Sequence, residues 1–271
     1  MQPLAAKVPE ITALFWVIKV LTTGMGESMS DYLGQHSRPL AVLIASFGLW
    51  FTMRLQLRER EYRATVYWSA VMMVAVFGTM VADGIHIAAG LPYAVSTPLC
   101  AVGVAVIFFS WYRSEGTLSI HSITTRRREL YYWAAVLATF ALGTAAGDLT
   151  AVSLNLGFFG SVVLFAAVMG IPALGWWGHR LNPILAFWAA YVITRPLGAS
   201  IVDYFGKPHA RTGLGLGDGP VSAIALVVFV ALVAYLAITK SDIQGPGGGD
   251  PPRRARHPLA MNGAEIQPAE A

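Results

Sequence analysis

The fold is decided by residues 15–31, which read FWVIKVLTTGMGESMSD. In this stretch an aromatic-Trp pair is followed by Gly26, ten residues after the Trp, and by Asp31, five residues after the Gly. The same order and spacing return three more times along the chain. The further copies are residues 67–83 (YWSAVMMVAVFGTMVAD), 132–148 (YWAAVLATFALGTAAGD) and 187–203 (FWAAYVITRPLGASIVD). Agreement of three positions in four segments predicts four tandem repeats.

The composition is that of a membrane protein. Of the 271 residues, 55% are apolar and only 13% are charged, whereas an ordinary soluble domain has about 25% charged residues. The mean hydropathy of +0.56 is too high for a chain that must cover a single core with a polar surface. The lipid bilayer is therefore the expected partner. The net charge of +4 is interpreted as a topology signal, and we expect no nucleic-acid partner.

Eight apolar windows have about the 20 residues that cross a hydrocarbon core. They are 12–33, 39–57, 65–88, 93–112, 130–151, 156–174, 184–205 and 220–239. The predicted fold is therefore an all-α membrane protein with eight transmembrane helices, arranged as four parallel tandem helical hairpins. The predicted membrane domain is 1–240, with repeats at about 7–58, 59–113, 126–178 and 181–240, and residues 241–271 are predicted to be a disordered cytoplasmic tail.

The basic residues predict the orientation. Fourteen of the 19 Lys and Arg residues fall on the side of the termini, three fall on the opposite side and two lie within spans. Because cytoplasmic loops carry an excess of Lys and Arg, both termini are predicted to be cytoplasmic.

Further residues of the first copy carry a resemblance to a known family. They are Lys7-Val8-Pro9-Glu10, Phe15-Trp16, Lys19, Thr22-Thr23, Gly26-Glu27 and Asp31. Together with the three further copies of the motif, this set resembles the bacterial family of uncharacterised membrane-anchored proteins. Proteins of that family consist of four tandem copies of a two-helix membrane repeat of unknown function. The resemblance implies a location in the bacterial cytoplasmic (inner) membrane, and it implies no established reaction.

Each predicted repeat places an Asp inside a span, where an ionisable group is costly and generally faces a partner or a cavity. The first copy adds Lys19 and Glu27. The equivalents of Lys19 are Val71, Val136 and Tyr191, and those of Glu27 are Thr79, Thr144 and Ala199. Asp203 or Asp83 are the expected partners of Lys19, and Arg195 is the expected partner of Glu27. The candidates for ion binding or transport are Lys19, Thr22, Thr23, Glu27, Asp31, Asp83, Asp148, Asp203 and Arg195. A purely structural role for the four Asp residues is the competing interpretation.

The motif residues have simpler interpretations. An interfacial aromatic belt is favoured over substrate stacking for Trp16, Trp68, Trp133 and Trp188. Close helix packing is favoured over hinges for Gly26, Gly78, Gly143 and Gly198. Asp83 and His86, three residues apart, are the candidate metal ligands, although a histidine satisfied by other contacts is more common.

The sequence contains no nucleophile elbow, zinc-protease or P-loop signature. We therefore expect no enzyme and no cofactor. The leading hypothesis is a secondary transporter or exporter of a small ion, either a hard divalent cation or a proton-coupled solute. The alternatives are a structural or regulatory membrane protein, and a membrane-embedded enzyme that uses Glu27 and Asp31 as acid and base.

Overall fold

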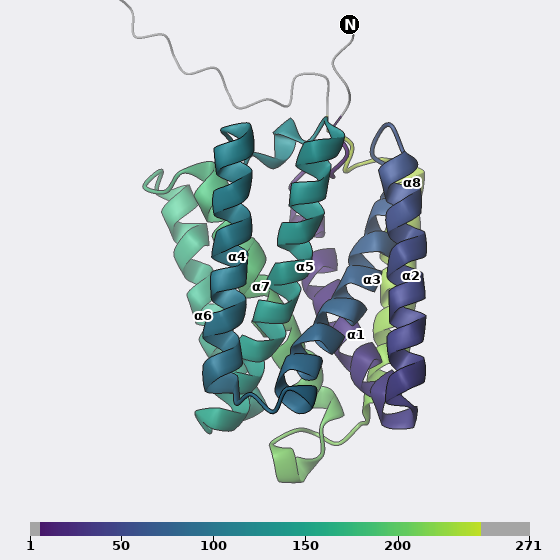
Figure 1. Ribbon diagram of the computed structural model, residues 1–271, viewed down its shortest axis with the longest axis vertical. Helices are drawn as coiled ribbons and strands as arrows, with labels where there is room; N and C mark the ends of the chain where they lie inside the picture. Colours follow the sequence, from purple (N-terminus) through teal and green to yellow (C-terminus); the bar gives the residue numbers. More distant parts are fainter. Residues whose placement is uncertain (1–5, 245–271) are drawn as a thin grey trace, which may run out of the picture.

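The computed structural model describes residues 6–244, and within that range the chain is helical and contains no strand. The eight long helices are α1 (Ala13–His36), α2 (Arg38–Arg58), α3 (Ala64–Asp83), α4 (Tyr93–Glu115), α5 (Arg126–Asp148), α6 (Gly157–Trp177), α7 (Pro183–Gly206) and α8 (Asp218–Thr239). They run side by side, alternately up and down (Figure 1). The prediction of an all-helical chain is confirmed, and each predicted span falls on one helix.

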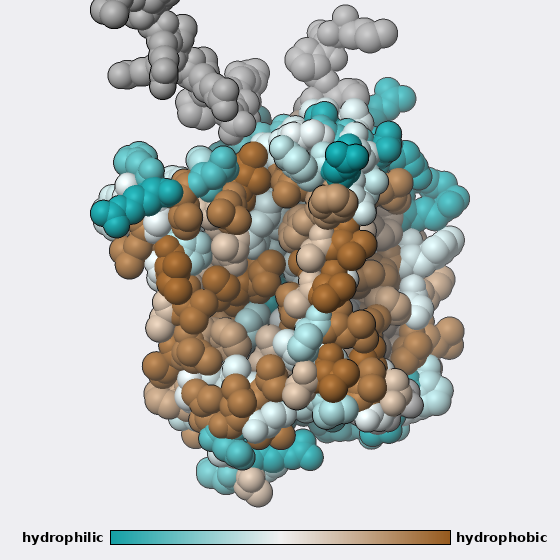
Figure 2. All heavy atoms as spheres, turned by 60° about the vertical axis from the view of Figure 1, so that its left-hand side comes forward, coloured by the Kyte–Doolittle hydropathy of each residue, from teal (hydrophilic) through white to brown (hydrophobic). Residues whose placement is uncertain are grey.

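Seven of these helices, α2 to α8, are long and apolar enough to cross a membrane. α1 has Lys19, Glu27 and Asp31 within its length and falls outside this set. Figure 2 shows hydrophobic residues over the middle of one face of the bundle, with hydrophilic residues gathered at its two ends. This distribution is that of a protein embedded in a bilayer.

The odd-numbered helices form an inner ring. α1 packs on α3, α3 on α5, α5 on α7, and α7 returns to α1. Within their most apolar windows, 56–61% of the residues of α3, α5 and α7 are buried, against 17% for α2, α4 and α6. The even-numbered helices therefore form an outer layer that presents large apolar side chains to the surroundings, such as Phe47 of α2 and Phe109 of α4.

The outer helices do not pack mainly within their own copy. The most extensive contacts of α2, α4 and α6 are with α3, α5 and α7, the inner helices of the following copies, and α8 closes the circle on α1. The predicted helical hairpin thus describes the path of the chain but not the packing unit. Each outer helix therefore packs mainly against the inner helix of the following copy, so neighbouring copies interlock.

Local sequence fixes several helix ends. The hydroxyl oxygens of Thr12 and Thr125 accept hydrogen bonds from the first turns of α1 and α5, and the Asn182 side chain does the same for α7. α3 and α5 continue into wide π turns, η1 (Gly84–Ala88) and η3 (Leu149–Ser153), and two short 3₁₀ turns, η2 (Ile120–Ser122) and η4 (His209–Arg211), lie in loops.

The two ends of the described chain meet at one end of the bundle (Figure 1). The Glu10 backbone N–H donates to the Asp242 carbonyl oxygen at 2.8 Å, and the Tyr62 hydroxyl donates to the Asp242 carboxylate. The structure therefore describes four residues, 241–244, past the predicted start of the tail, and Asp242 among them is hydrogen-bonded to the bundle. Asp242 is buried, and its Oδ2 accepts the hydrogen bond from Tyr62, whereas its Oδ1 has no hydrogen-bond partner among the described residues. The rest of the predicted tail, 245–271, lies outside the described residues.

Candidate functional site

The four motif glycines make one contact four times around the inner ring. Each glycine faces the residue that stands three positions before the motif glycine of the following copy. A Cβ on the glycine would come within 2.4 Å of Ala75 at Gly26, 2.5 Å of Phe140 at Gly78, 2.1 Å of Arg195 at Gly143 and 2.7 Å of Thr23 at Gly198. Such distances are too short for any side chain, so the glycines serve close packing between helices. The last contact closes the ring from the fourth copy to the first.

The aromatic-Trp pairs repeat the same circular order. The first aromatic residue of each pair lies against the Trp of the following copy, with ring centroids 5.7 Å apart for Phe15–Trp68, 5.6 Å for Tyr67–Trp133, 6.1 Å for Tyr132–Trp188 and 5.8 Å for Phe187–Trp16. Trp68, Trp133 and Trp188 are buried and Trp16 is half-buried. The interfacial-belt interpretation is therefore wrong, because these rings join inner helices to one another inside the bundle.

Two tyrosine hydroxyls meet within this aromatic layer. Tyr67 of α3 and Tyr132 of α5 hold equivalent motif positions, and their hydroxyl groups are hydrogen-bonded to each other. Both side chains are buried. Phe15 and Phe187 hold the same position in the other two copies, with their ring centroids 6.2 Å apart. Equivalent positions of adjacent copies therefore meet inside the ring.

Three equivalent polar side chains converge one residue after the motif glycines. The Thr144 and Thr79 hydroxyls donate to Oε2 of Glu27 at 2.8 Å and 3.1 Å, and the two threonine oxygens are 3.4 Å apart. All three side chains are buried. α1, α3 and α5 thus each contribute one residue, and Ala199, also buried, is the equivalent on α7. The carboxylate of Glu27 is the acidic member of this cluster.

Two cationic side chains are buried nearer the aromatic layer. Lys19 and Arg195 are 1% and 0% exposed, and within residues 6–244 their side-chain nitrogens have no hydrogen-bond partner. Lys19 Nζ lies 4.0 Å from the ring centroid of Tyr191 and 4.3 Å from that of Phe140, and the Arg195 guanidinium lies 3.0 Å from Phe140. Aromatic faces therefore stabilise both charges.

The predicted ion pairs of these cations are wrong. Among the described residues, Lys19 makes no salt bridge with Asp203 or Asp83, and Arg195 makes none with Glu27. Asp203 lies 12 residues beyond Tyr191 on α7, toward the opposite end of the bundle, and Glu27 is held by threonines. The hydroxyls of Thr22 and Thr23, two other predicted site residues, donate to the Lys19 carbonyl oxygen within α1.

At the end of the bundle away from the termini, Asp31 and Asp203 meet two residues that the sequence did not indicate. Lys207 Nζ bonds to Asp31, lies 3.2 Å from the Asp218 carboxylate and lies 3.7 Å from that of Asp203. Burial opposes the charge of Lys207, but the surrounding carboxylates prevail and raise its pKa above the ordinary value for lysine. Lys207 follows Asp203 by four residues, a spacing that could have indicated the pair.

The four motif Asp residues therefore divide into two kinds. Asp31 and Asp203 join Asp218, with one oxygen from each carboxylate within 4.8 Å of the others. Asp83 and Asp148 do not join this group; each is half-buried and ends its helix directly before a π turn. His86 bonds through Nδ1 to the Leu91 carbonyl oxygen at 2.7 Å, so the structure gives no support for the predicted Asp83–His86 metal pair.

Three segments of the chain match a known family of repeats. Residues 66–117, 131–181 and 186–242 each match the family described as Repeat of Unknown Function (DUF347), and together they span more than half of the chain. The chain belongs to this family. Its first copy, which carries Lys19 and Glu27, lies before the matched DUF347 repeats but makes the same glycine and aromatic contacts. No curated protein and no solved structure matches the chain.

Proposed function

We propose that the chain crosses a bacterial cytoplasmic membrane eight times, with both termini in the cytoplasm. α1 supports the eighth crossing, since it has 24 residues and belongs to the same inner ring as three apolar helices. At about 1.5 Å per residue it is longer than the hydrocarbon core. The charged residues of α1 are enclosed by α3, α7 and α8 instead of lipid, which removes the main cost of placing them in a span.

We further propose that this protein is a secondary transporter of a small, proton-coupled solute, and that Glu27 carries the proton. The observation behind this proposal is the cluster of Glu27, Thr79 and Thr144, in which equivalent positions of three copies converge on one buried carboxylate. Among the described residues Glu27 accepts hydrogen bonds from neutral hydroxyls and makes no salt bridge that would fix it in its ionised form. It is therefore suited to gain and lose a proton as a solute passes.

The charges around Glu27 favour a proton-coupled solute over a hard divalent cation. Lys19 of α1 and Arg195 of α7 are two buried cations inside the same ring, and they would repel a divalent cation there. The carboxylates best placed to bind such a cation, those of Asp31, Asp203 and Asp218, already hold Lys207. Buried cations are instead compatible with a solute that carries an anionic or hydrogen-bond-accepting group.

A structural or regulatory membrane protein without transport is the second candidate. It is favoured by the tight contacts of the four motif glycines, which join the inner helices closely. A membrane-embedded enzyme is less well supported, because Asp31 bonds to Lys207 and no hydrogen bond links it to Glu27 among the described residues. We accordingly propose that the protein is not an enzyme.

The decisive experiment uses the full chain in sealed proteoliposomes with an imposed proton gradient. Uptake and proton flux are measured across a panel of small metabolites and divalent cations. We expect Glu27→Gln and Lys19→Met to abolish transport, because each removes a buried charge from the inner ring. Thr79→Val and Thr144→Val should reduce transport only modestly, since each leaves one hydroxyl donor on Glu27.

Glu129→Gln provides the matched control. Glu129 is a buried carboxylate at the end of the bundle that holds the termini, where it bonds to Lys7 at 2.6 Å and to Gln56. Its loss should lower stability while transport by the folded protein persists. Transport that survives in the Glu27→Gln, Lys19→Met double variant would refute the role of these residues. Wild-type vesicles that move nothing in the panel and conduct no protons would favour the structural alternative.

A further inference from the structure

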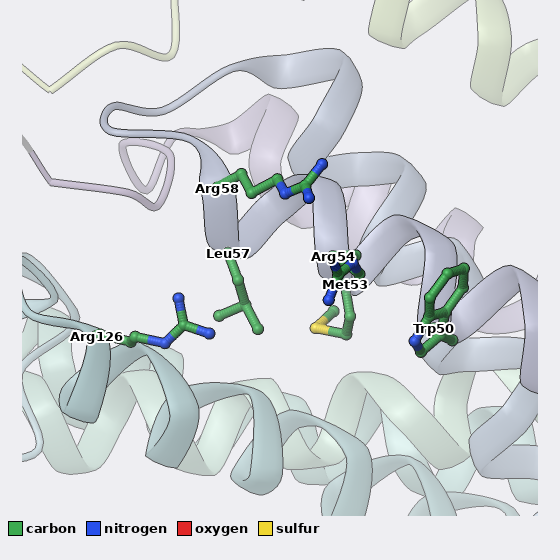
Figure 3. Close-up of a pocket in the computed structure, with 6 residues that line it drawn as sticks. All are labelled: Trp50, Met53, Arg54, Leu57, Arg58 and Arg126. Carbon is green, nitrogen blue, oxygen red and sulfur yellow. The ribbon is translucent and has the colours of Figure 1, made fainter.

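A cleft of about 410 Å³ opens between α2 and the start of α5, at the end of the bundle that holds the termini. Its lining residues are Trp50, Met53, Arg54, Leu57 and Arg58 of α2 and Arg126, the first residue of α5. Figure 3 shows Met53 and Leu57 projecting from α2 over α5, while Arg126 enters from the α5 side. The cleft lies on the outer surface and is separate from the polar residues of the inner ring.

The cleft is cationic and lacks compensating acids. Arg54, Arg58 and Arg126 make no salt bridge with any described residue, and all three are exposed. No acidic residue lines the cleft, and Glu59 and Glu115 are paired elsewhere, Glu59 with Arg63 and Glu115 with Arg127 and Arg128. Three arginines without a salt bridge therefore line one cleft that has no acidic lining residue, which is a favourable arrangement for an anion with several acceptor oxygens.

Along α2, from its end toward the middle, arginines are followed by a tryptophan and then by apolar residues, which matches the order of head group and acyl chain in a phospholipid. Arg58 and Arg54 lie near the end of the helix, whereas Trp50 lies four and eight residues farther in, at about 6 and 12 Å along the axis. Trp50 is exposed, and its ring lies 5.7 Å from the Arg54 guanidinium carbon. Beyond it, Phe47 and Leu43 are also exposed on the same helix. Cationic groups at the membrane surface thus lead directly into an apolar track.

We propose that this cleft binds one anionic phospholipid. Its phosphodiester group lies among Arg54, Arg58 and Arg126, and an acyl chain follows Met53 and Trp50 along α2. Basic pockets between membrane helices on the cytoplasmic side are a known type of site for anionic head groups. The proposal rests on the membrane location of the chain and is independent of transport.

The first test measures lipid retention by the purified full chain in detergent, using native mass spectrometry. Phosphatidylglycerol and phosphatidylcholine with identical acyl chains compete for the protein. We expect phosphatidylglycerol to be preferred, and the Arg54→Gln, Arg58→Gln, Arg126→Gln variant to bind it about 100-fold more weakly, at about fivefold per arginine. The matched control neutralises Arg60, Arg113 and Arg180, three exposed arginines at the same end, and should retain the preference.

The second test locates the acyl chain. Phosphatidylglycerol brominated in its chains should quench the fluorescence of Trp50, measured as the difference between the wild type and Trp50→Phe. The arginine triple variant should lose this quenching, and the control variant should keep it. Equal loss of phosphatidylglycerol from both triple variants, or displacement of the lipid by millimolar inorganic phosphate, would overturn the proposal. The first result would indicate general surface charge, and the second would indicate a free-phosphate site.

Discussion

A Cβ atom on Gly143 of α5 would lie 2.1 Å from the Cβ of Arg195 on α7. The absence of a side chain at Gly143 therefore lets the Arg195 stem enter between the two helices. The guanidinium then reaches the face of Phe140, which stands one turn before Gly143 on the same helix. One glycine thus permits both the close approach of α5 and α7 and the burial of a charge inside the ring.

We predict that Gly78→Ala and Gly143→Ala destabilise the protein by about 1–3 kcal/mol each, because the added methyl group overpacks a contact between inner helices. Thermal unfolding in a single detergent measures the effect. Gly103→Ala on the outer helix α4 is the matched control, since a Cβ there meets nothing within 4 Å. The control should be neutral or slightly stabilising through helix propensity. Equal effects at the three sites would contradict the close-packing role.

A second prediction concerns the Tyr67–Tyr132 hydroxyl pair. Tyr67→Phe and Tyr132→Phe should each cost about 1–3 kcal/mol, because the remaining hydroxyl is left buried without its partner. The double variant should cost clearly less than the sum of the two, and a double-mutant cycle on unfolding free energies measures this coupling. Tyr235→Phe, at an exposed tyrosine of α8, serves as the reference. Additive losses would show that the two hydroxyls do not interact.

Lys207 provides a prediction with a pH dependence. Lys207→Gln leaves Asp31, Asp203 and Asp218 together without their cation, and we expect a loss of about 3 kcal/mol at pH 7. The pKa of Lys207 is raised by these carboxylates against the effect of burial. The stability that its charge contributes is therefore fully present below the ordinary lysine pKa of about 10.4, and it is lost only as the pH rises through the higher folded pKa.

Unfolding temperatures of wild type and Lys207→Gln should accordingly differ by a constant amount between pH 6 and about 9. This difference in unfolding temperature should become smaller in acid. Lys207 keeps its charge there, but protonation of the three carboxylates removes the repulsion that destabilises the variant. Lys240→Gln removes an exposed lysine at the other end of the bundle and should leave the curve unchanged. A gap that widens on acidification would show that Lys207 does not neutralise these carboxylates.

The orientation is predicted from the distribution of basic residues. A reporter enzyme that works only outside the cytoplasm should be inactive when it is fused after residue 240. The same reporter inserted into the α7–α8 loop near Gly215 should be active, because that loop lies at the opposite end of the bundle (Figure 1). Activity of the fusion after residue 240 would reverse the orientation of the chain.

The positions of the helices were predictable from the sequence, because each apolar window is a local property and the spacing from Trp to Gly to Asp repeats without insertion. The alignment of the copies also indicated that Glu27, Thr79 and Thr144 are equivalent. It did not indicate that these residues meet, since convergence depends on how the four inner helices close into a ring. Local hydropathy also cannot distinguish a Trp that faces another helix from one that faces lipid, which explains the error about the aromatic pairs.

The group around Lys207 was missed for a related reason. Asp31 and Asp203 belong to the repeated motif, whereas Lys207 and Asp218 lie at the edges of the α7–α8 loop, which is longer than the equivalent connections of the other copies. The long-range contact between Asp31 and Lys207 joins the first copy to the fourth, and no pattern within one repeat specifies it. Contacts between the first and the last copy are therefore the hardest to predict from sequence patterns, because they depend on how the helices close into a ring.

The contact that each motif glycine makes with the following copy, including the return from Gly198 to Thr23, has an evolutionary consequence. A ring closed by four equivalent contacts is a shape that four separate two-helix subunits would form as a symmetric homotetramer. Fusion of the genes into one chain removes the requirement for identical subunits. A single lysine, glutamate or arginine can then be introduced once instead of four times, so a symmetric ancestor can acquire one charged centre without burying four like charges together.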